Sequence, residues 1–311
     1  MRLRSSDSTP GKRLRVGVIL PDTEWEMGGD TPRWSDISVM ALAAEGAGFD
    51  SVWVFDHLLY RFSGKPDQGA WECWSNLAAL AAITEQVDIG PVVCCTGYRN
   101  PALLAKMAET VDEISGGRLI LGLGAGWLES DYTAFGYPYD YRVSRFEEAV
   151  EIIHGLLHTG HVDFSGRFYS ARDCELRPRG PRPNGLPIMI GSSAPRMLQV
   201  LARFGDSWNA WAVQSLAELE EHRQKVDAAM ELAGRDPATI ERSVTLLVDT
   251  PDATGRPSED KPGLKARTPE ELAEFMLAYA EAGVAEIQIM LDPNTMKGIE
   301  WSARALEHLE L

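Results

Sequence analysis

The sequence predicts an α/β protein of the (β/α)8-barrel class, with insertion loops at the carboxyl-terminal face of the barrel. Short apolar runs rich in β-branched residues alternate with longer runs that have helical spacing. Eight runs of each kind are present, which is the number of strands and helices in a (β/α)8 barrel. A doubly wound sheet is the alternative, but it needs no particular number of units.

The strand candidates are short and continuously apolar, as suits parallel strands that are buried on both faces. In chain order they are Val16–Leu20, Ser51–Phe55, Val87–Cys95, Leu119–Leu123, Ile188–Ile190, Ser207–Ala210, Val244–Val248 and Glu286–Met290. We therefore expect a single domain over residues 15–311, after a flexible basic tail at residues 1–14.

Helical patterns lie between the strands, and three carry start signals. Asn100 before Pro101 fits an N-cap followed by proline at the first helical position. Ser144 to Glu147 (SRFE) and Thr268 to Glu271 (TPEE) are capping boxes. The remaining helices are expected at Trp34–Ala47, Glu72–Thr84, Ala194–Phe204, Leu216–Ala233 and Ile299–Leu309.

Three connections are longer than simple turns: residues 128–143, 160–186 and 249–267. Long loops in a domain are usually functional or disordered. The first and third follow strands four and seven, so they are expected at the carboxyl-terminal face, where they would form a lid. The second enters strand five from the opposite end. Mobile surface is the alternative for all three.

Composition excludes several classes of function. The chain of 311 residues has 30 basic and 46 acidic residues, a net charge of −16 that argues against nucleic acid and anionic membranes as partners. Its start has no apolar segment like that of a secretory signal, and no run approaches a membrane span. The four cysteines form no Cys-x-x-Cys pair, so no metal site is predicted. We expect a cytoplasmic protein.

Glycines close the fourth strand in the stretch GGRLILGLGAGWLESD, residues 116–131. Gly122, Gly124 and Gly126 approach a dinucleotide fingerprint, but its third glycine position holds Trp127, where an indole prevents the close packing of helix on strand. A Walker loop is excluded because no Gly-Lys-Ser/Thr follows. What remains is a strand end whose backbone can approach a ligand closely.

A second turn of small residues, GSSAP at 191–195, follows strand five and leads into a helix, with Ser193 as the expected N-cap. Free N–H groups at a helix start favour phosphate. Because strands four and five are neighbours in a barrel, both turns would open on one face. Together they predict a phosphate-bearing ligand, although ordinary glycine turns are the alternative for each.

Candidate catalytic residues also lie at strand ends. Asp56 and His57 close strand two, and a histidine beside a carboxylate suits proton transfer, with a structural role as the alternative. Glu72, between two tryptophans, is the nearest further carboxylate and is a candidate acid or substrate contact. Five aromatic residues would either wall a flat ligand or pack their loop onto the barrel: Tyr132, Phe135, Tyr137, Tyr139 and Tyr141.

Three stretches resemble the bacterial-luciferase-like oxidoreductases, specifically the type that uses the deazaflavin coenzyme F420. They are AAEGAGFDSVWVFDHL at 43–58, TGYRNPALLAKMAETVDEISGGRLILGLGAGW at 96–127 and PIMIGSSAPRMLQVLARFGDSWN at 187–209. The resemblance implies a TIM barrel, a small-molecule substrate and a homodimer. It implies that the cofactor lies across the carboxyl-terminal face and that the family's base or orienting histidine corresponds to His57.

The resemblance also implies the cofactor contacts. Asp56 would touch the deazaflavin, and a bulge with a non-prolyl cis peptide would lie near Val92 and Val93. The full set of implied cofactor-binding residues is Asp56, Val92, Val93, Cys95, Ala125, Gly126, Ser130, Gly191, Ser192 and Ala194.

One departure concerns the substrate. Relatives that oxidise a sugar phosphate carry a glutamate where this chain has Trp127, which argues against that substrate. An FMN-dependent monooxygenase is the alternative function. A cofactor carrier without turnover and a glycosidase are further alternatives, but the glycosidase needs two carboxylates at strand ends that the turn after strand four does not supply.

Overall fold

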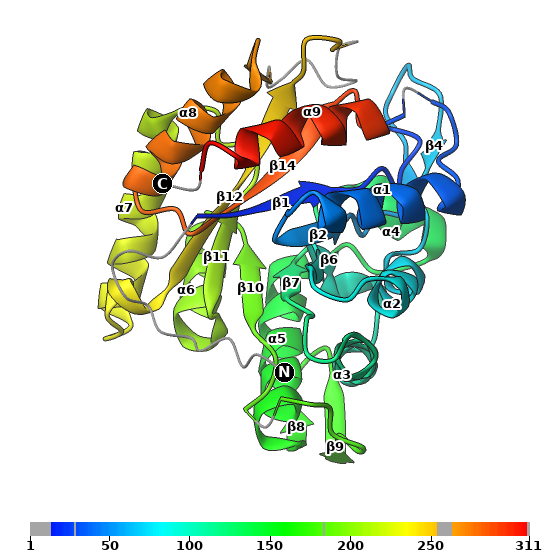
Figure 1. Ribbon diagram of the computed structural model, residues 1–311. Coiled ribbons are helices and arrows are strands. Elements are labelled where there is room, and N and C mark those ends of the chain that lie inside the picture. The colour runs from blue at the N-terminus through cyan, green and yellow to red at the C-terminus, as the bar shows by residue number, and fades with distance from the viewer. Residues whose placement is uncertain (1–13, 28, 183, 254–262, 310–311) are drawn as a thin grey trace.

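A barrel of parallel strands forms the centre of the protein, and helices surround it (Figure 1). The computed structural model describes residues 14–27, 29–182, 184–253 and 263–309. The neighbours in the barrel follow the order β5, β2, β1, β14, β12, β11, β10, β7, β6. Their bounds are β1 Arg15–Ile19, β2 Ser51–Val54, β5 Asp88–Pro91, β6 Cys94–Cys95, β7 Leu121–Gly124, β10 Ile188–Gly191, β11 Ser207–Ala210, β12 Glu241–Asp249 and β14 Glu286–Asp292.

The third strand is split into β5 and β6, so these nine segments occupy the eight predicted strand positions. β5 pairs with β2, and β6 pairs with β7. A bridge between Ile89 and Leu119 closes the ring below the split. The Val92–Val93 peptide between the two segments is cis, which confirms the predicted bulge and its position.

The eight predicted helices are present, with ends shifted by up to three residues. They are α1 Trp34–Gly46, α2 Cys73–Ile83, α3 Pro101–Ser115, α5 Arg142–Thr159, α6 Pro195–Phe204, α7 Leu216–Leu232, α8 Pro269–Glu281 and α9 Met296–Leu306. Asn100 and Thr268 cap their helices as predicted. The prediction of a capping box that starts at Ser144 was wrong. α5 begins at Arg142, and the side chain of its N-cap residue, Tyr141, makes no capping hydrogen bond.

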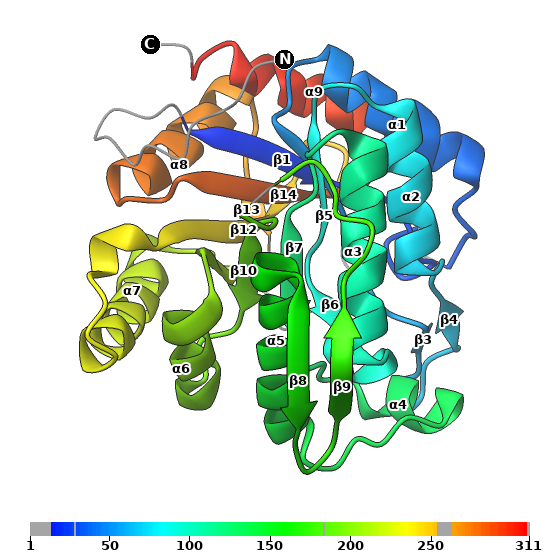
Figure 2. The same ribbon diagram turned by 90° about the horizontal axis from the view of Figure 1, so that it is seen from below.

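Two of the predicted loops contain regular structure. Residues 128–143 include a short helix, α4 Glu129–Phe135, and residues 160–186 include a hairpin of β8 His161–Ser165 and β9 Ser170–Glu175 (Figure 2). A second hairpin, β3 Leu59–Tyr60 with β4 Gln68–Gly69, follows β2. The predicted lid at 249–267 lies partly outside the described residues, as do residues 1–13 of the predicted tail.

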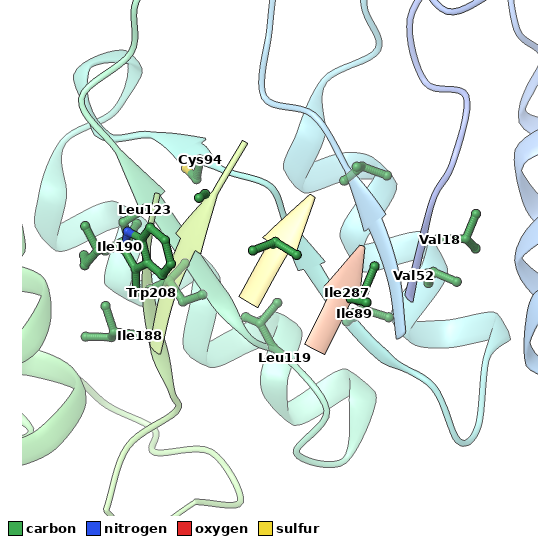
Figure 3. Packing of buried hydrophobic residues seen from close by; sticks show 14 of the residues in the cluster. Val18, Val52, Ile89, Cys94, Leu119, Leu123, Ile188, Ile190, Trp208 and Ile287 are labelled. Atoms are coloured by element: carbon green, nitrogen blue, oxygen red, sulfur yellow. The ribbon is translucent and has the colours of Figure 1, made fainter. Parts of the chain in front are cut away.

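Side chains fill the barrel on both sides of its wall. Alternate strand residues face outward into the layer between strands and helices, among them Val18, Val52 and Ile190 (Figure 3). Inside, Trp53 is fully buried, and a Cβ at Gly17 or Gly90 would lie 2.6 Å from its ring. Glycine on the two neighbouring strands therefore makes room for the indole.

A charged network closes the amino-terminal end of the barrel. The guanidinium of Arg15 pairs with Glu241 and with Glu286, and Ser51 donates to Glu286 at 2.7 Å. None of the helices in the described part of the chain is long and apolar enough to cross a bilayer.

Candidate active site

The carboxylate of Asp56 anchors the bulge at the carboxyl-terminal end of the barrel. It follows β2, is fully buried, and accepts the Cys95 N–H at 2.8 Å. The guanidinium of Arg99 donates hydrogen bonds to both carboxylate oxygens of Asp56, at 2.7 Å and 2.9 Å. A bidentate guanidinium fixes a carboxylate in position as well as in charge. Asp56 therefore ties the end of β2 to β6, directly beside the cis peptide.

His57 is held by a partner that sequence reasoning missed. Its Nδ1 lies 2.7 Å from Oδ2 of Asp131, which is completely buried in α4. Asp131 also accepts the Tyr98 hydroxyl at 3.0 Å and the Leu59 N–H at 2.6 Å. With Nδ1 engaged, Nε2 is the ring nitrogen left for a substrate, an assignment that rests on hydrogen-bond partners.

Glu72 is engaged in structural contacts. Its carboxylate caps α2 by accepting the N–H groups of Trp74 and Ser75, and it lies 2.7 Å from the Arg99 guanidinium. Burial pushes its pKa upward, but Arg99 and the helix donors outweigh burial and leave the pKa lowered. These contacts favour positioning of Arg99 over proton donation.

Close contacts explain the glycines at the ends of strands four and five. A Cβ at Gly124 would lie 2.7 Å from the Val93 side chain, and one at Gly191 would lie 2.8 Å from it. Gly126 has φ +69°, and its missing Cβ leaves room for Tyr132 and Cys95. The bulge thus packs against both small-residue turns, which brings the four predicted segments together at one end of the barrel.

The start of α6 lacks a side-chain cap, so the prediction of Ser193 as N-cap was wrong. Ala194 occupies that position, and its own N–H donates to the Ser192 hydroxyl at 3.1 Å. Pro195 follows at the first position, so the first free helical donors belong to Arg196 and Met197. Ser130 lies in α4, shortly after the turn that closes strand four. Its hydroxyl is buried without a hydrogen-bond partner among the described residues.

Most of the predicted aromatic loop packs onto the barrel. Tyr132 is fully buried and lies edge-on to Tyr98 and Tyr139, with ring centroids 4.9 Å and 5.2 Å apart. Phe135 and Tyr141 are exposed. Tyr137 and Tyr139 are partly buried and pack against the cluster that contains Tyr132, so packing is the correct alternative for these three residues.

Asp22 is a further site residue that sequence reasoning missed. It follows β1, is fully buried, and accepts the Phe55 N–H at 3.2 Å. Its other carboxylate oxygen has no partner in the described part of the chain. Burial and the nearby Glu26 raise its pKa well above the usual range. The sequence signal available for Asp22 was its position just after a strand end, whereas Asp131 lies in α4, seven residues beyond the end of β7, and carries no such signal.

Comparison with known proteins connects these features to one family. Residues 14–253 match the model of the luciferase-like monooxygenases. The 5,10-methylenetetrahydromethanopterin reductase of Archaeoglobus fulgidus is 32% identical over 203 residues, which cover 65% of this chain and 57% of that protein. The F420-dependent glucose-6-phosphate dehydrogenase of Amycolatopsis mediterranei is 33% identical over 180 residues, 56% of this chain and 52% of that protein. The chain thus spans about half the length of these curated relatives.

Solved structures share the fold. An F420-dependent secondary alcohol dehydrogenase in complex with an F420–acetone adduct has a TM-score of 0.79 at 20% identity and covers 96% of this chain and 100% of its own. A riboflavin lyase with modified FMN and riboflavin has a TM-score of 0.78 at 15% identity, with 96% and 92% covered. At such identities the likeness establishes the TIM-barrel fold, which confirms the predicted fold class.

Proposed function

Because this chain belongs to the luciferase-like monooxygenase family, we propose that it is an F420-dependent oxidoreductase that transfers a hydride between the deazaflavin and a small organic substrate. The observation that carries the proposal is the convergence of Asp56, the cis bulge and both small-residue turns at one end of the barrel. Relatives whose names specify F420 support this cofactor.

The residues at this end fit the two parts of the cofactor. Uncapped N–H groups at the start of α6 suit its phosphate, and the bulge offers an apolar surface for its ring. F420 supplies hydride transfer at C5 of the deazaflavin when it is bound. The residues proposed to hold it are Asp56, Val92, Val93, Cys95, Ala125, Gly126, Ser130, Gly191, Ser192 and Ala194.

Proton transfer is assigned to His57. Asp131 holds Nδ1, which leaves Nε2 to exchange the proton that accompanies the hydride. Glu72 keeps Arg99 in place, and Arg99 keeps Asp56 in place. This assignment replaces the role of acid that the sequence suggested for Glu72.

A charge placed at the start of α6 tests the proposed phosphate site. Ala194→Glu puts a carboxylate beside the free helix donors, whereas Ala194→Gln has nearly the same shape without the charge. We expect Ala194→Glu to raise the Kd for F420 about tenfold or more and Ala194→Gln to change it little. Cofactor fluorescence measures both. Equal effects of the two variants would contradict the proposal that the phosphate binds at the start of α6. Tight binding of FMN with no binding of F420 would favour the FMN-dependent alternative.

We also propose a homodimer that forms through α1, α2 and α3. Figure 2 shows these helices side by side on one flank. α2, with the sequence CWSNLAALAAI, has no charged residue, whereas a helix face in contact with water usually carries charged side chains. Val39, Leu42 and Leu103 are exposed on its neighbours. A second copy of the chain would cover this flank.

Sedimentation at matched concentrations tests the dimer. Leu103→Glu is expected to give monomers, while Leu232→Glu, at the end of α7, keeps the dimer because it lies outside the flank. An unchanged dimer with Leu103→Glu contradicts this interface. The single domain over residues 15–311 and the cytoplasmic location remain predictions.

A further inference from the structure

An aromatic wall stands beside His57. It consists of Trp25, Tyr60, Phe62 and Trp127, which come from the segment after β1, the β3–β4 hairpin and the turn after β7. The Tyr60 and Trp127 rings lie 4.5 Å and 5.6 Å from the His57 ring, centroid to centroid. Phe62 stacks on Trp127 at 6.3 Å and 23° and lies 5.0 Å from Trp25. Two segments thus place rings beside the imidazole, and Trp25 from a third segment extends the wall by packing on Tyr60 and Phe62.

Core packing does not account for the outer edge of this wall. The Trp127 side chain is 59% exposed, although an indole gains more from burial than almost any other side chain. Phe62 and Trp25 are half-buried. A stacked Phe–Trp pair that is open to solvent beside the proposed proton-transfer residue offers a planar apolar surface to a ligand.

Charges of both signs surround the wall, at different places. Burial, followed by the negative charges of Glu26 and Asp22, raises the pKa of the Tyr60 hydroxyl well above its usual range. A cation lies at another member of the wall, since Nζ of Lys65 is 5.3 Å from the centroid of the Trp25 ring. A phosphate or carboxylate group placed beside Tyr60 and His57 would therefore meet acidic side chains, which disfavours an anion at that end of the wall.

We propose that the substrate is an uncharged secondary alcohol that carries an aromatic ring, or the corresponding ketone, and that this ring stacks on Trp127 and Phe62. This inference rests on the proposed function. In the oxidative direction the hydroxyl gives its proton to Nε2 of His57 and the carbinol C–H gives its hydride to oxidised F420, which leaves the ketone. In the reductive direction the hydride returns to the carbonyl carbon and the proton to its oxygen. Stacking fixes the ring, and the reacting carbon lies next to the imidazole.

Three probes separate the possible ligand classes. 2-Acetonaphthone is a planar neutral ketone, cyclohexyl methyl ketone has the same functional group without a flat ring, and glucose 6-phosphate is an anion. The Kd for each probe is measured by tryptophan fluorescence or calorimetry, with and without F420. We expect the wild-type protein to bind the naphthone at least tenfold more tightly than the cyclohexyl ketone and to show the weakest binding for the sugar phosphate.

Variants of the wall residues test whether the naphthone binds at the aromatic wall. Trp127→Leu and Phe62→Leu are each expected to raise the Kd for the naphthone about three- to tenfold and to leave the Kd for F420 within twofold of wild type. Phe135→Leu is the matched control, because Phe135 is equally aromatic and 53% exposed on α4. Its Kd for the naphthone should not change.

The outcomes distinguish this inference from the proposed function. If F420 binds but Trp127→Leu and Phe62→Leu bind the naphthone as the wild type does, the wall is not the substrate site. Preference for glucose 6-phosphate would overturn the inference as well. If F420 does not bind but naphthone binding still depends on Trp127, the proposed cofactor is wrong and the wall stands as a binding site for planar neutral molecules.

Discussion

Replacing Asp131 by asparagine tests how His57 is prepared for proton transfer. The buried carboxylate accepts hydrogen bonds from Tyr98 and Leu59 in addition to holding His57, at 2.6–3.0 Å. An amide keeps one accepting oxygen, but it turns its NH2 group toward at least one donor. The variant loses a charge-assisted hydrogen bond, and one buried donor then faces the NH2 group of the amide in place of an acceptor. Together these changes lower the free energy of unfolding by about 2–4 kcal/mol.

The effect on catalysis should be larger than the effect on binding. Without the carboxylate, the imidazole of His57 loses the partner that selects its tautomer, so we expect kcat to fall about 10²- to 10³-fold. KM and the Kd for F420 should change less than threefold. Nitrogen NMR of the labelled imidazole reports which ring nitrogen carries the proton, a readout that a purely structural role for Asp131 would leave unchanged.

Tyr98→Phe is the control for this prediction. It removes one hydrogen bond to Asp131 and leaves the carboxylate and its contact with His57 in place, so it should cost about 1 kcal/mol of stability and less than a threefold loss of kcat. Wild-type kcat and an unaltered tautomer in folded Asp131→Asn protein would refute the proposed role of the pair.

Three further predictions concern stability. Gly124→Ala should lower the free energy of unfolding by about 1–3 kcal/mol because its Cβ would overlap Val93, whereas Gly46→Ala, with open space around it, should be neutral or slightly stabilising in thermal melts. Arg99→Met should cost about 3–5 kcal/mol in denaturant titrations, because it leaves a buried carboxylate without its cation; a loss below 1 kcal/mol contradicts that estimate. Burial raises the pKa of Asp112 to about 6, so the folded state binds more protons than the unfolded state between about pH 4 and 6, and this residue lowers stability as pH rises through that window. Relative to wild type, Asp112→Asn should therefore become more stable by about 2–3 kcal/mol from pH 4 to pH 7, and a pH-independent difference would contradict this.

The barrel was predictable because its signals are local. Eight apolar runs separated by helical patterns fix the order of the elements, and caps such as Asn100 and Thr268 fix the starts of two helices. The errors arose where long-range packing decides the start of a helix. α5 begins ahead of the capping box at Ser144, and α6 begins at Pro195 with no side-chain cap.

The site was predictable only in part, because its polar contacts join distant segments. Asp56 and His57 were recognised from their strand end, and the bulge at Val92–Val93 from the resemblance. Their partners Arg99 and Asp131 are 43 and 74 residues away in the sequence. No spacing rule connects such positions. The reason for the glycines at the end of strand four was equally hidden, since Gly124 accommodates the side chain of Val93, and Gly126 accommodates Tyr132 and Cys95.

The crystal structure of this protein with F420 bound is the most direct test of the account. We predict that the deazaflavin ring lies against the Val92–Val93 peptide, with Nε2 of His57 on its substrate side and the cofactor phosphate within hydrogen-bond distance of the first N–H groups of α6. A cofactor bound away from the carboxyl-terminal end of the barrel, or a phosphate held far from α6, would contradict the central claim that these segments form one site.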